Sequence, residues 1–242
     1  MPADTTNELG QAVGFPIADW RPSPLPPRRT LDGRWCRVEP IDVARHAGAL
    51  QAALATDAAG ADWSYLPYGP FDTEEAFESW LHETCLSDDP MFFAIVDGQT
   101  DRAVGLASYL NIHRAHGTIE VGHIHFSPAL QRSRIATEAM YLMMGHAFGA
   151  GYRRYEWKCN AHNTRSRRAA QRFGFSYEGI FRQHMVVRGH NRDSAWYACV
   201  DGEWPALRDA YETWLAAENF DEAGAQRLSL SALTRPLLVA TD

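Results

Sequence analysis

The sequence predicts one mixed α/β or α+β domain, in which a sheet carries helices on both faces. Two observations predict this class. Strand-like and helix-like segments alternate from residue 31 to residue 217, which is typical of a layered domain. The chain has 242 residues, of which 45% are hydrophobic and 22% charged, so it can bury a full core.

Residues 1–30 are expected to form an extended N-terminal arm, because the run from Pro22 to Pro27 contains four prolines and cannot continue a helix. The main domain is expected to span residues 31–202. Residues 203–242 are expected to add a last helix and a tail.

Short apolar runs that end at turn residues predict strands, as where 91–96 precedes Asp97 and Gly98. The turn 189–191 is expected to join the last two strands as a hairpin. In chain order the predicted strands are 34–39, 91–96, 103–112, 118–126, 153–159, 175–187 (broken near Gly179) and 193–200.

Capping residues followed by apolar residues at helical spacing predict the helices. Asp42 is the expected N-cap of a helix that runs to Leu54. Thr73 opens a second helix, with acidic residues in its first turn. The others are 135–148, closed by Gly149 and Gly151; 166–173, ended by Gly174; and 203–217, with Pro205 at its start.

The net charge of -7 argues against a general nucleic-acid binder, which would carry a basic face. The charge is uneven, however. Ten Arg and Lys lie between Arg153 and Arg192, eleven with Arg134 upstream, against only Glu156 and Glu178. Such a region indicates either a local anionic ligand or a solvated helix face.

No apolar run reaches the ~20 residues of a membrane helix, and no secretion signal opens the chain. The four cysteines lie far apart and form no CxxC pair, which favours neither a zinc site nor a disulfide framework. We therefore expect a cytoplasmic protein without a membrane partner.

The most informative segment runs from Gly122 to Ala139, where a strand passes through a short loop into a long helix. A helix N-terminus offers unpaired N–H groups and a positive dipole end, which suit a pyrophosphate. Arg132 and Arg134 add charge, and the small Ser133 and Ala136 let a ligand approach the backbone.

Within it, the run from Gln131 to Ala136 resembles the pyrophosphate loop Gln/Arg-x-x-Gly-x-Gly/Ala of the GNAT superfamily of acetyltransferases, with Arg134 in place of the central glycine. The segment 160–175 resembles the family's Asn-x-x-Ser block that ends in Gly-Phe. The stretch 178–197 is similar to the subgroup that acetylates the N-terminal amines of ribosomal proteins.

The resemblance implies a mostly antiparallel sheet whose central strands four and five splay apart, with acetyl-CoA as co-substrate. In the family the acyl carbonyl bonds to strand backbone in that gap, here near 124–126. The coenzyme-binding residues it implies are Phe126, Gln131, Arg132, Ser133, Arg134, Ile135, Ala136, Thr137 and Asn163.

The resemblance also suggests catalytic residues for attack of an amine on a thioester. Glu120, on the fourth strand and on the same face as Gly122, is the candidate general base; the alternative is a surface residue or an ion pair with an arginine. Ser166 is the candidate acid toward the thiolate; the alternative is a coenzyme hydrogen bond. Tyr141, Tyr152 and Tyr177 are reserves, and for each of them packing is the preferred explanation.

Trp63 and Tyr65, between the first two helices, and His125 are the predicted substrate-pocket residues, although packing is the alternative for each. His123 and His125 also invite a metal site, since they alternate on one strand. No carboxylate follows at the spacing of a known motif, so we predict no metal.

The function expected from these observations is N-acyl transfer from acetyl-CoA to a primary amine, either a protein N-terminus or a small amine. A second hypothesis is a coenzyme A-binding or regulatory module without catalysis, because Arg134 replaces glycine. A third is a metal enzyme built on the histidines. A homodimer stays open as the assembly.

Overall fold

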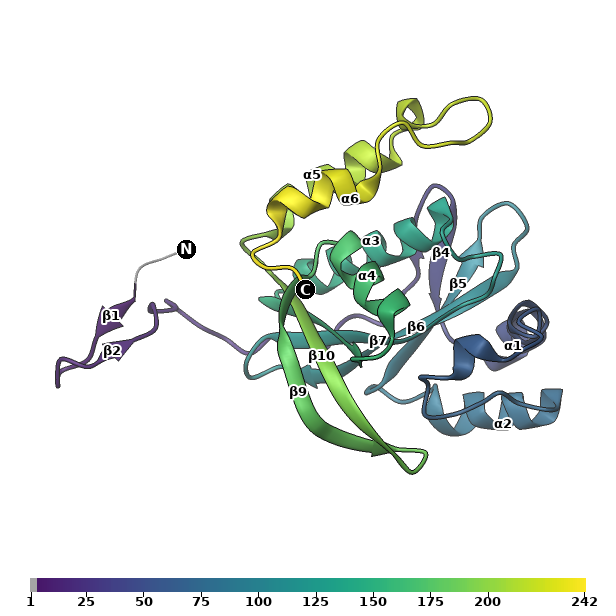
Figure 1. Ribbon diagram of the computed structural model, residues 1–242, viewed down its shortest axis with the longest axis horizontal. Helices are drawn as coiled ribbons and strands as arrows, with labels where there is room; N and C mark the ends of the chain where they lie inside the picture. The colour runs from purple at the N-terminus through teal and green to yellow at the C-terminus, as the bar shows by residue number, and fades with distance from the viewer. Residues whose placement is uncertain (1–3) are drawn as a thin grey trace.

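An eight-stranded sheet forms the middle layer of the molecule (Figure 1). The structure is a computed structural model that describes residues 4–242. Along the sheet the strand order is β3-β4-β5-β6-β7-β8-β10-β9. Its strands are β3 Leu31–Asp32, β4 Cys36–Pro40, β5 Met91–Asp97, β6 Ala103–His113, β7 Thr118–Phe126, β8 Arg154–Asn160, β9 Ser176–Val187 and β10 His190–Val200.

Helices cover both faces of this sheet, which confirms the predicted fold class (Figure 1). One face carries α1 (Val43–Leu54), η1 (Ala61–Trp63) and α2 (Glu74–Thr84). The other carries α3 (Arg134–Gly149), α4 (Thr164–Arg172), α5 (Trp204–Leu215) and α6 (Leu230–Thr234), with the short η2 (Ala217–Asn219) and η3 (Arg235–Leu237). None of the helices within residues 4–242 is long and apolar enough to cross a membrane.

The alternation of side chains along β5 explains why the core has two halves. Phe93 and Ile95 face the cluster under α3, whereas Phe92 and Ala94 face the cluster under α1 and α2. Successive strand residues point to opposite faces, so a strand that is apolar at every position is buried between two layers.

Strands β7 and β8 are the only neighbours in the sheet that run parallel, and they pair over four residues only. The pairing extends from Thr118↔Arg154 to Val121↔Trp157. Beyond these residues β7 continues to Phe126 and β8 to Asn160 without pairing to each other. The predicted splay of the fourth and fifth strands is therefore confirmed.

Two element boundaries near the C-terminal hairpin differ from the prediction. Strand β10 begins at His190 instead of Asp193, because Arg188 and Gly189 alone make the turn, with φ of 49° and 76°. A two-residue turn with positive φ at both positions suits the twist of paired strands. The expected break at Gly179 is a register shift within a continuous β9.

The first thirty residues include a small hairpin and an extended segment. Strands β1 (Thr5–Thr6) and β2 (Ala12–Val13) pair in a hairpin that stands away from the domain (Figure 1). Farther along, the Ser23 hydroxyl donates to the Gly151 carbonyl (2.9 Å), and the Tyr152 hydroxyl donates to the Pro24 carbonyl (2.9 Å). The proline-rich run therefore lies against the domain.

Candidate active site

The gap between β7 and β8 is the central feature of the candidate site. Each strand keeps its outer neighbour, β6 or β10, but beyond Val121 and Trp157 the inner edges face each other unpaired. Unpaired strand edges present free backbone N–H and C=O groups. The gap can therefore hold an extended ligand through main-chain hydrogen bonds.

A β-bulge in β7 borders this gap. The register with β6 jumps from Leu106↔His125 to Ser108↔Gly122, so His123 and Ile124 lie opposite Ala107 alone. His123 adopts a φ of 49°, which is unusual for a residue other than glycine. A bulge turns the strand locally and redirects its backbone groups. The backbone of residues 124–126, which is predicted to bind the acyl carbonyl, begins within this bulge.

The turn after β7 leads into the N-terminus of α3, one residue earlier than predicted. Ser133 is the N-cap, and its hydroxyl accepts a hydrogen bond from the Ala136 N–H (3.0 Å) and donates to the Leu130 carbonyl (2.6 Å). The N–H groups of Arg134 and Ile135 lie in the first helical turn, where no intrahelical acceptor exists. These groups and the helix dipole can bind an anion.

Arg134, at the position of the usual glycine, does not have a left-handed backbone; it is the first residue of α3. Its guanidinium lies over the ring of Phe220, 4.5 Å from the centroid, and 5.7 Å from the Trp35 centroid. The side chain of Arg134 thus packs on aromatic rings. Its backbone N–H, in the first turn of α3, is the part that can face an anion at the helix N-terminus.

Gln131 ties the turn to the loop between α1 and α2. Its amide nitrogen donates to Asp62 (2.6 Å) and to the Phe126 carbonyl (3.1 Å). Asp62 also pairs with Arg165 of α4 at 3.4 Å. Arg132, next to Gln131, is exposed with a φ of 59°. The η1 loop therefore contacts both sides of the gap's mouth.

Helix α4 begins at Thr164, two residues earlier than predicted, with Asn163 as its N-cap. The Asn163 side chain accepts a hydrogen bond from the Ser166 N–H (3.1 Å). Helix α4 ends before Gly174, which has the expected left-handed φ of 89°. The capping amide orients Asn163 toward the helix, but its remaining N–H donors stay available to a ligand.

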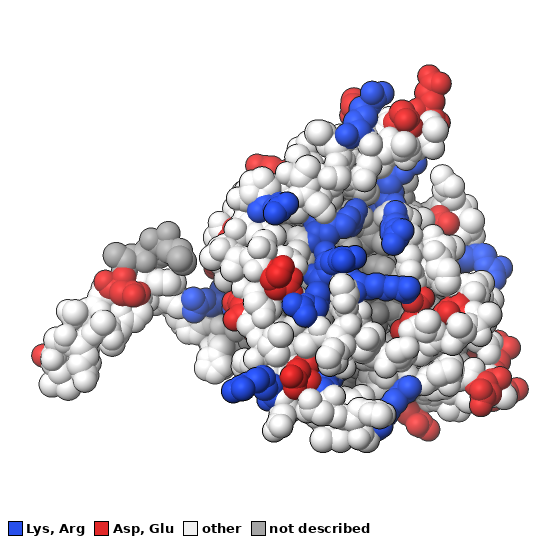
Figure 2. All heavy atoms as spheres, viewed as in Figure 1, with Lys and Arg blue, Asp and Glu red and all other residues white. Residues whose placement is uncertain are grey.

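Basic side chains gather over α4 and near the N-terminus of α3, where Figure 2 shows a cluster of Lys and Arg atoms. Of the four arginines in α4, Arg165 and Arg168 are exposed. Arg167 pairs with Asp242 at 2.6 Å, and Arg172 donates to the Thr137 hydroxyl (3.1 Å). The exposed pair leaves a positive surface beside the N-terminal turn of α3, although Arg165 also pairs with Asp62.

Ser166 lies next to the gap, on the first turn of α4. Its hydroxyl accepts a hydrogen bond from the indole N–H of Trp157 (3.0 Å), the β8 residue at which pairing with β7 ends. The hydroxyl keeps its own proton for donation. Ser166 can therefore serve either as an acid or as a hydrogen-bond donor to a ligand.

Glu120 lies in the paired part of β7 and is only 5% exposed. Lys158 pairs with one carboxylate oxygen at 2.8 Å, and the Asn111 amide donates to the same oxygen at 2.7 Å. Burial raises the pKa of Glu120, although Lys158 and Asn111 counteract it. Both alternatives weighed from the sequence are wrong, because Glu120 is not an exposed surface residue and its ion-pair partner is a lysine instead of an arginine. Gly122 shares its face, as predicted.

The three predicted pocket residues divide into two environments. Trp63 and His125 are buried against each other, with ring centroids 4.0 Å apart. Tyr65 is 39% exposed, and its hydroxyl donates to the His162 carbonyl (3.3 Å) across the mouth of the gap. Trp63 and His125 thus pack beneath the η1 loop, and Tyr65 lies at the mouth of the gap.

The β9–β10 hairpin reaches over the face that carries Glu120. At its tip Arg188 donates to the carbonyls of Tyr68 (2.8 Å) and Gly69. The Tyr68 hydroxyl contacts Nδ1 of His123 at 3.0 Å. The hairpin, the α1–α2 loop and β7 therefore enclose this face of the gap.

Around the histidines of β7, as elsewhere within residues 4–242, no group of three or more His, Cys, Asp or Glu is placed to hold a metal ion. Burial lowers the pKa of both His123 and His125 to about 4. Both rings are therefore neutral at neutral pH and pack among aromatic side chains.

The three reserve tyrosines have packing roles. The Tyr141 hydroxyl donates to Glu212 (3.0 Å), and the buried Tyr152 bonds to the N-terminal arm. Tyr177 packs against Tyr197 with centroids 5.5 Å apart.

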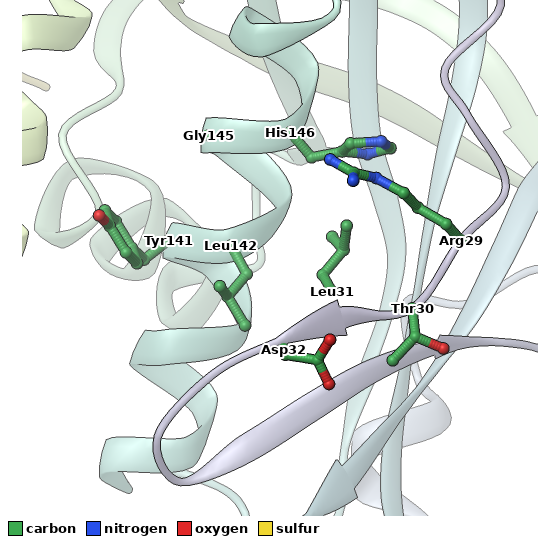
Figure 3. Close-up of a pocket in the computed structure, with 8 residues that line it drawn as sticks. All are labelled: Arg29, Thr30, Leu31, Asp32, Tyr141, Leu142, Gly145 and His146. Carbon is green, nitrogen blue, oxygen red and sulfur yellow. The ribbon is translucent and has the colours of Figure 1, made fainter.

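A second concavity lies between the middle of α3 and the segment leading into β3. Figure 3 shows the Arg29 guanidinium next to the His146 ring. Nε2 of His146 is buried with no hydrogen-bond partner within residues 4–242. Burial and the Arg29 charge lower the pKa of His146 to about 4. Of the residues weighed from the sequence as site candidates, the reserve Tyr141 lines this concavity.

Two residues at the gap were missed by sequence reasoning. No sequence pattern marks Asp62 as a site residue, because it is an ordinary acidic residue in a loop. The sequence does mark Lys158, since it is the only lysine in the chain beside 22 arginines.

Comparisons with known proteins agree with this geometry. The model of the acetyltransferase (GNAT) domain matches residues 37–176. A crystal structure of a GCN5-related N-acetyltransferase from Brucella melitensis is 45% identical, with a TM-score of 0.88 over 90% of this chain and 100% of that one. A probable GNAT-family acetyltransferase from Chromobacterium violaceum is 43% identical, with a TM-score of 0.76 over 81% of this chain and 98% of that one. The uncharacterized N-acetyltransferase YnaD of Bacillus subtilis is 26% identical over 141 residues, which are 58% of this chain and 81% of that protein.

Proposed function

Because the chain belongs to the GNAT family of acetyltransferases, we propose that it transfers the acetyl group of acetyl-CoA to a primary amine at the gap between β7 and β8. One observation carries the proposal. The gap that opens beyond Val121 and Trp157 continues along β7 into the N-terminus of α3. A thioester in the gap and a pyrophosphate at the helix terminus thus lie on one path.

The pyrophosphate is assigned to the first turn of α3, where the N–H groups of Arg134 and Ile135 have no intrahelical acceptor and Gln131 and Arg132 precede the helix. Ala136 and Thr137 complete that turn, but their N–H groups bond to Ser133. The helix dipole and the exposed arginines of α4 favour an anion there. Asn163, at the start of α4, is assigned to the pantetheine arm. Backbone of residues 124–126 polarises the acyl carbonyl.

In the proposed reaction the amine nitrogen attacks the thioester carbonyl, so a C–N bond forms and the C–S bond breaks. Glu120 takes the proton that the amine loses, directly or through a water. The leaving thiolate takes the hydroxyl proton of Ser166 and departs as the free thiol of coenzyme A. Solvent then returns a proton to Ser166, and Glu120 releases the amine proton to solvent, so both residues regain their starting states. An α-amine has a pKa of about 8, so weak base assistance is enough.

The acceptor is assigned to the face under the β9–β10 hairpin, on which Glu120 lies. We propose either a protein N-terminal amine or a small amine as acceptor. All four cysteines are free and buried, which supports a reducing, cytoplasmic setting.

Release of free coenzyme A thiol from acetyl-CoA, measured on a panel of peptides and a panel of small amines, tests the proposal. We expect turnover on one panel and calorimetric binding of coenzyme A. Binding without turnover on either panel would support a coenzyme A-binding module, and absence of binding would contradict both.

A further inference from the structure

Lys158 stands out from every other basic residue of the chain. It is one lysine beside 22 arginines. A lysine carries a compact ammonium with three donors, whereas an arginine carries a wide planar fork. Lys158 follows Trp157, the last β8 residue paired with β7. The single ammonium on a lysine side chain therefore lies where the two strands part.

Its contacts hold the ammonium in one place. Nζ lies 2.8 Å from Glu120 and 3.4 Å from Glu156, and 3.8 Å from the ring centroid of Trp196 on β10. The side chains of Lys158 and Glu120 are only 13% and 7% exposed. Water therefore screens the attraction between the two side chains weakly. The charged form of each side chain is stabilised by the charge of the other.

We propose that Lys158 is a positioning residue of the transfer reaction, which holds Glu120 as a carboxylate at the edge of the gap so that it can accept the amine proton. This inference rests on the proposed function, because it requires Glu120 to be the general base. Lys158 itself touches neither acyl group nor coenzyme in this role.

The surroundings of Glu120 explain why a cation is needed. A carboxyl removed from water prefers its protonated form, and burial raises the pKa of Glu120. The charge and hydrogen bond of Lys158 and the uncharged Asn111 of β6 lower the pKa, and Glu156 raises it. The net pKa stays above that of a free carboxyl, so loss of Lys158 would raise it further. Arg154 pairs with Glu156 and with Glu178 of β9, so it offsets the second carboxylate instead of Glu120.

The test compares the pH profiles of kcat/KM for the wild type and Lys158→Met. Since Lys158 lowers the pKa of Glu120, its removal raises that pKa. We expect the acidic limb to move to higher pH by about 1–3 pH units, because an opposite charge at this distance shifts a carboxyl pKa by about that much. Well below the limb, the rate falls on the order of tenfold for each pH unit. Calorimetric affinity for coenzyme A stays unchanged.

Arg154→Met is the matched control, because it removes a cation from the same strand and face without touching Glu120. Its acidic limb moves less than that of Lys158→Met, because Arg154 acts on Glu120 only indirectly, through Glu156. An unmoved limb in Lys158→Met, or an equal movement in both variants, overturns the inference. If the methionine variant does not fold, Lys158→Gln carries the same expectation.

Glu120→Gln separates this inference from the proposed function. Full activity with an intact acidic limb in Glu120→Gln refutes the base assignment itself. A strong loss in Glu120→Gln together with an unmoved limb in Lys158→Met leaves the base in place and refutes only the role of Lys158.

Discussion

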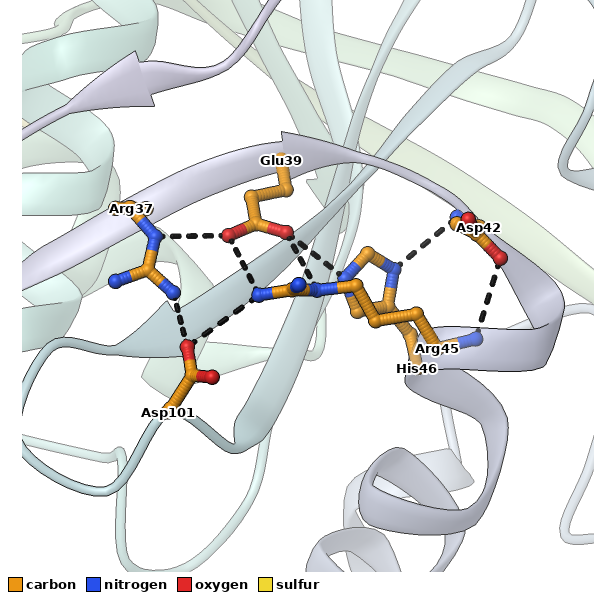
Figure 4. A network of polar contacts seen from close by, with 6 residues as sticks. All are labelled: Arg37, Glu39, Asp42, Arg45, His46 and Asp101. Atoms are coloured by element: carbon orange, nitrogen blue, oxygen red, sulfur yellow. Dashed lines mark hydrogen bonds and ion pairs between the residues drawn. The ribbon is translucent and has the colours of Figure 1, made fainter.

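Glu39 shows how one buried carboxylate joins several segments. It accepts hydrogen bonds from Arg37 (2.8 Å), Arg45 (3.2 Å) and the ring of His46 (3.1 Å), and both arginines also contact Asp101 (Figure 4). Burial raises the pKa of Glu39, but hydrogen bonds from Arg37 and His46 and the charge of Arg45 lower it by more. The net result is a lowered pKa, so β4, α1 and the β5–β6 turn are linked through an ionised group.

Replacing Glu39 by Gln should therefore lower stability at neutral pH by about 1–3 kcal/mol, the usual effect of losing hydrogen bonds to a charged group. A folded pKa below the unfolded value stabilises the protein above pH ~4.3, and the stabilisation disappears as pH falls through the folded pKa. The free energy of unfolding, measured by denaturant from pH 7 to pH 3, should thus converge for Glu39→Gln and wild type in acid. A difference in unfolding free energy that stays constant from pH 7 to pH 3 would contradict a stabilisation that depends on the ionised Glu39 carboxylate.

At the scale of elements, the η1 loop is the segment that lies across the site. Asp62 holds Gln131 and Arg165, and Tyr65 bonds to the β8–α4 loop. The loop therefore places a carboxylate, whose side chain is 17% exposed, beside the turn assigned to the pyrophosphate. A negative charge there opposes the binding of an anion.

Asp62→Asn should bind coenzyme A more tightly than wild type. Removing a unit charge near a partly exposed anion site is worth about 1 kcal/mol, or roughly a fivefold lower Kd. Calorimetry at low and high salt checks this, and the gain should shrink as salt screens the charge. Asp72→Asn, an exposed change of equal charge in the same connection, should leave the Kd unchanged. Weaker binding by Asp62→Asn would instead mean that the loop's contacts help to hold the coenzyme.

The elements themselves were largely predictable, because their signals are local. Asp42 and Thr73 cap the helices that they were expected to open, since a capping side chain needs only the next three residues. The separation of β7 and β8 was predicted from the family resemblance and not from local spacing. Strand pairing joins residues that lie far apart in the sequence, so no local pattern indicates where it ends.

The partners of the site residues were not predictable. Glu120 meets Lys158, 38 positions away, and Gln131 meets Asp62, 69 positions away. Arg134 turns to Phe220, in a C-terminal segment that the sequence presented as a tail. Such pairs are set by how the layers stack, which no single local pattern records.

At the scale of the molecule, residues 203–242 belong to the main core. Leu207, Tyr211 and Trp214 of α5 and Leu230 of α6 are buried in the cluster around α3. The Tyr211 hydroxyl donates to the carbonyl at the end of α4 (2.9 Å). The C-terminal segment therefore covers the same face that carries the candidate coenzyme-binding helices.

A chain ending at residue 202 should consequently fail to form a stable fold. Each large apolar side chain lost from the core removes about 1.5–3 kcal/mol, so four of them together rival the roughly 5–15 kcal/mol that stabilises a whole domain. Arg172 would also lose the ring of Trp214. Circular dichroism melts and size-exclusion chromatography should show aggregation or no cooperative transition.

Deleting residues 1–19 instead, which removes the projecting hairpin, should leave the Tm nearly unchanged, because the side chains described there are almost all exposed. A 1–202 fragment that melts cooperatively near the wild-type Tm would mean that α3 and α4 hold their positions without the C-terminal layer.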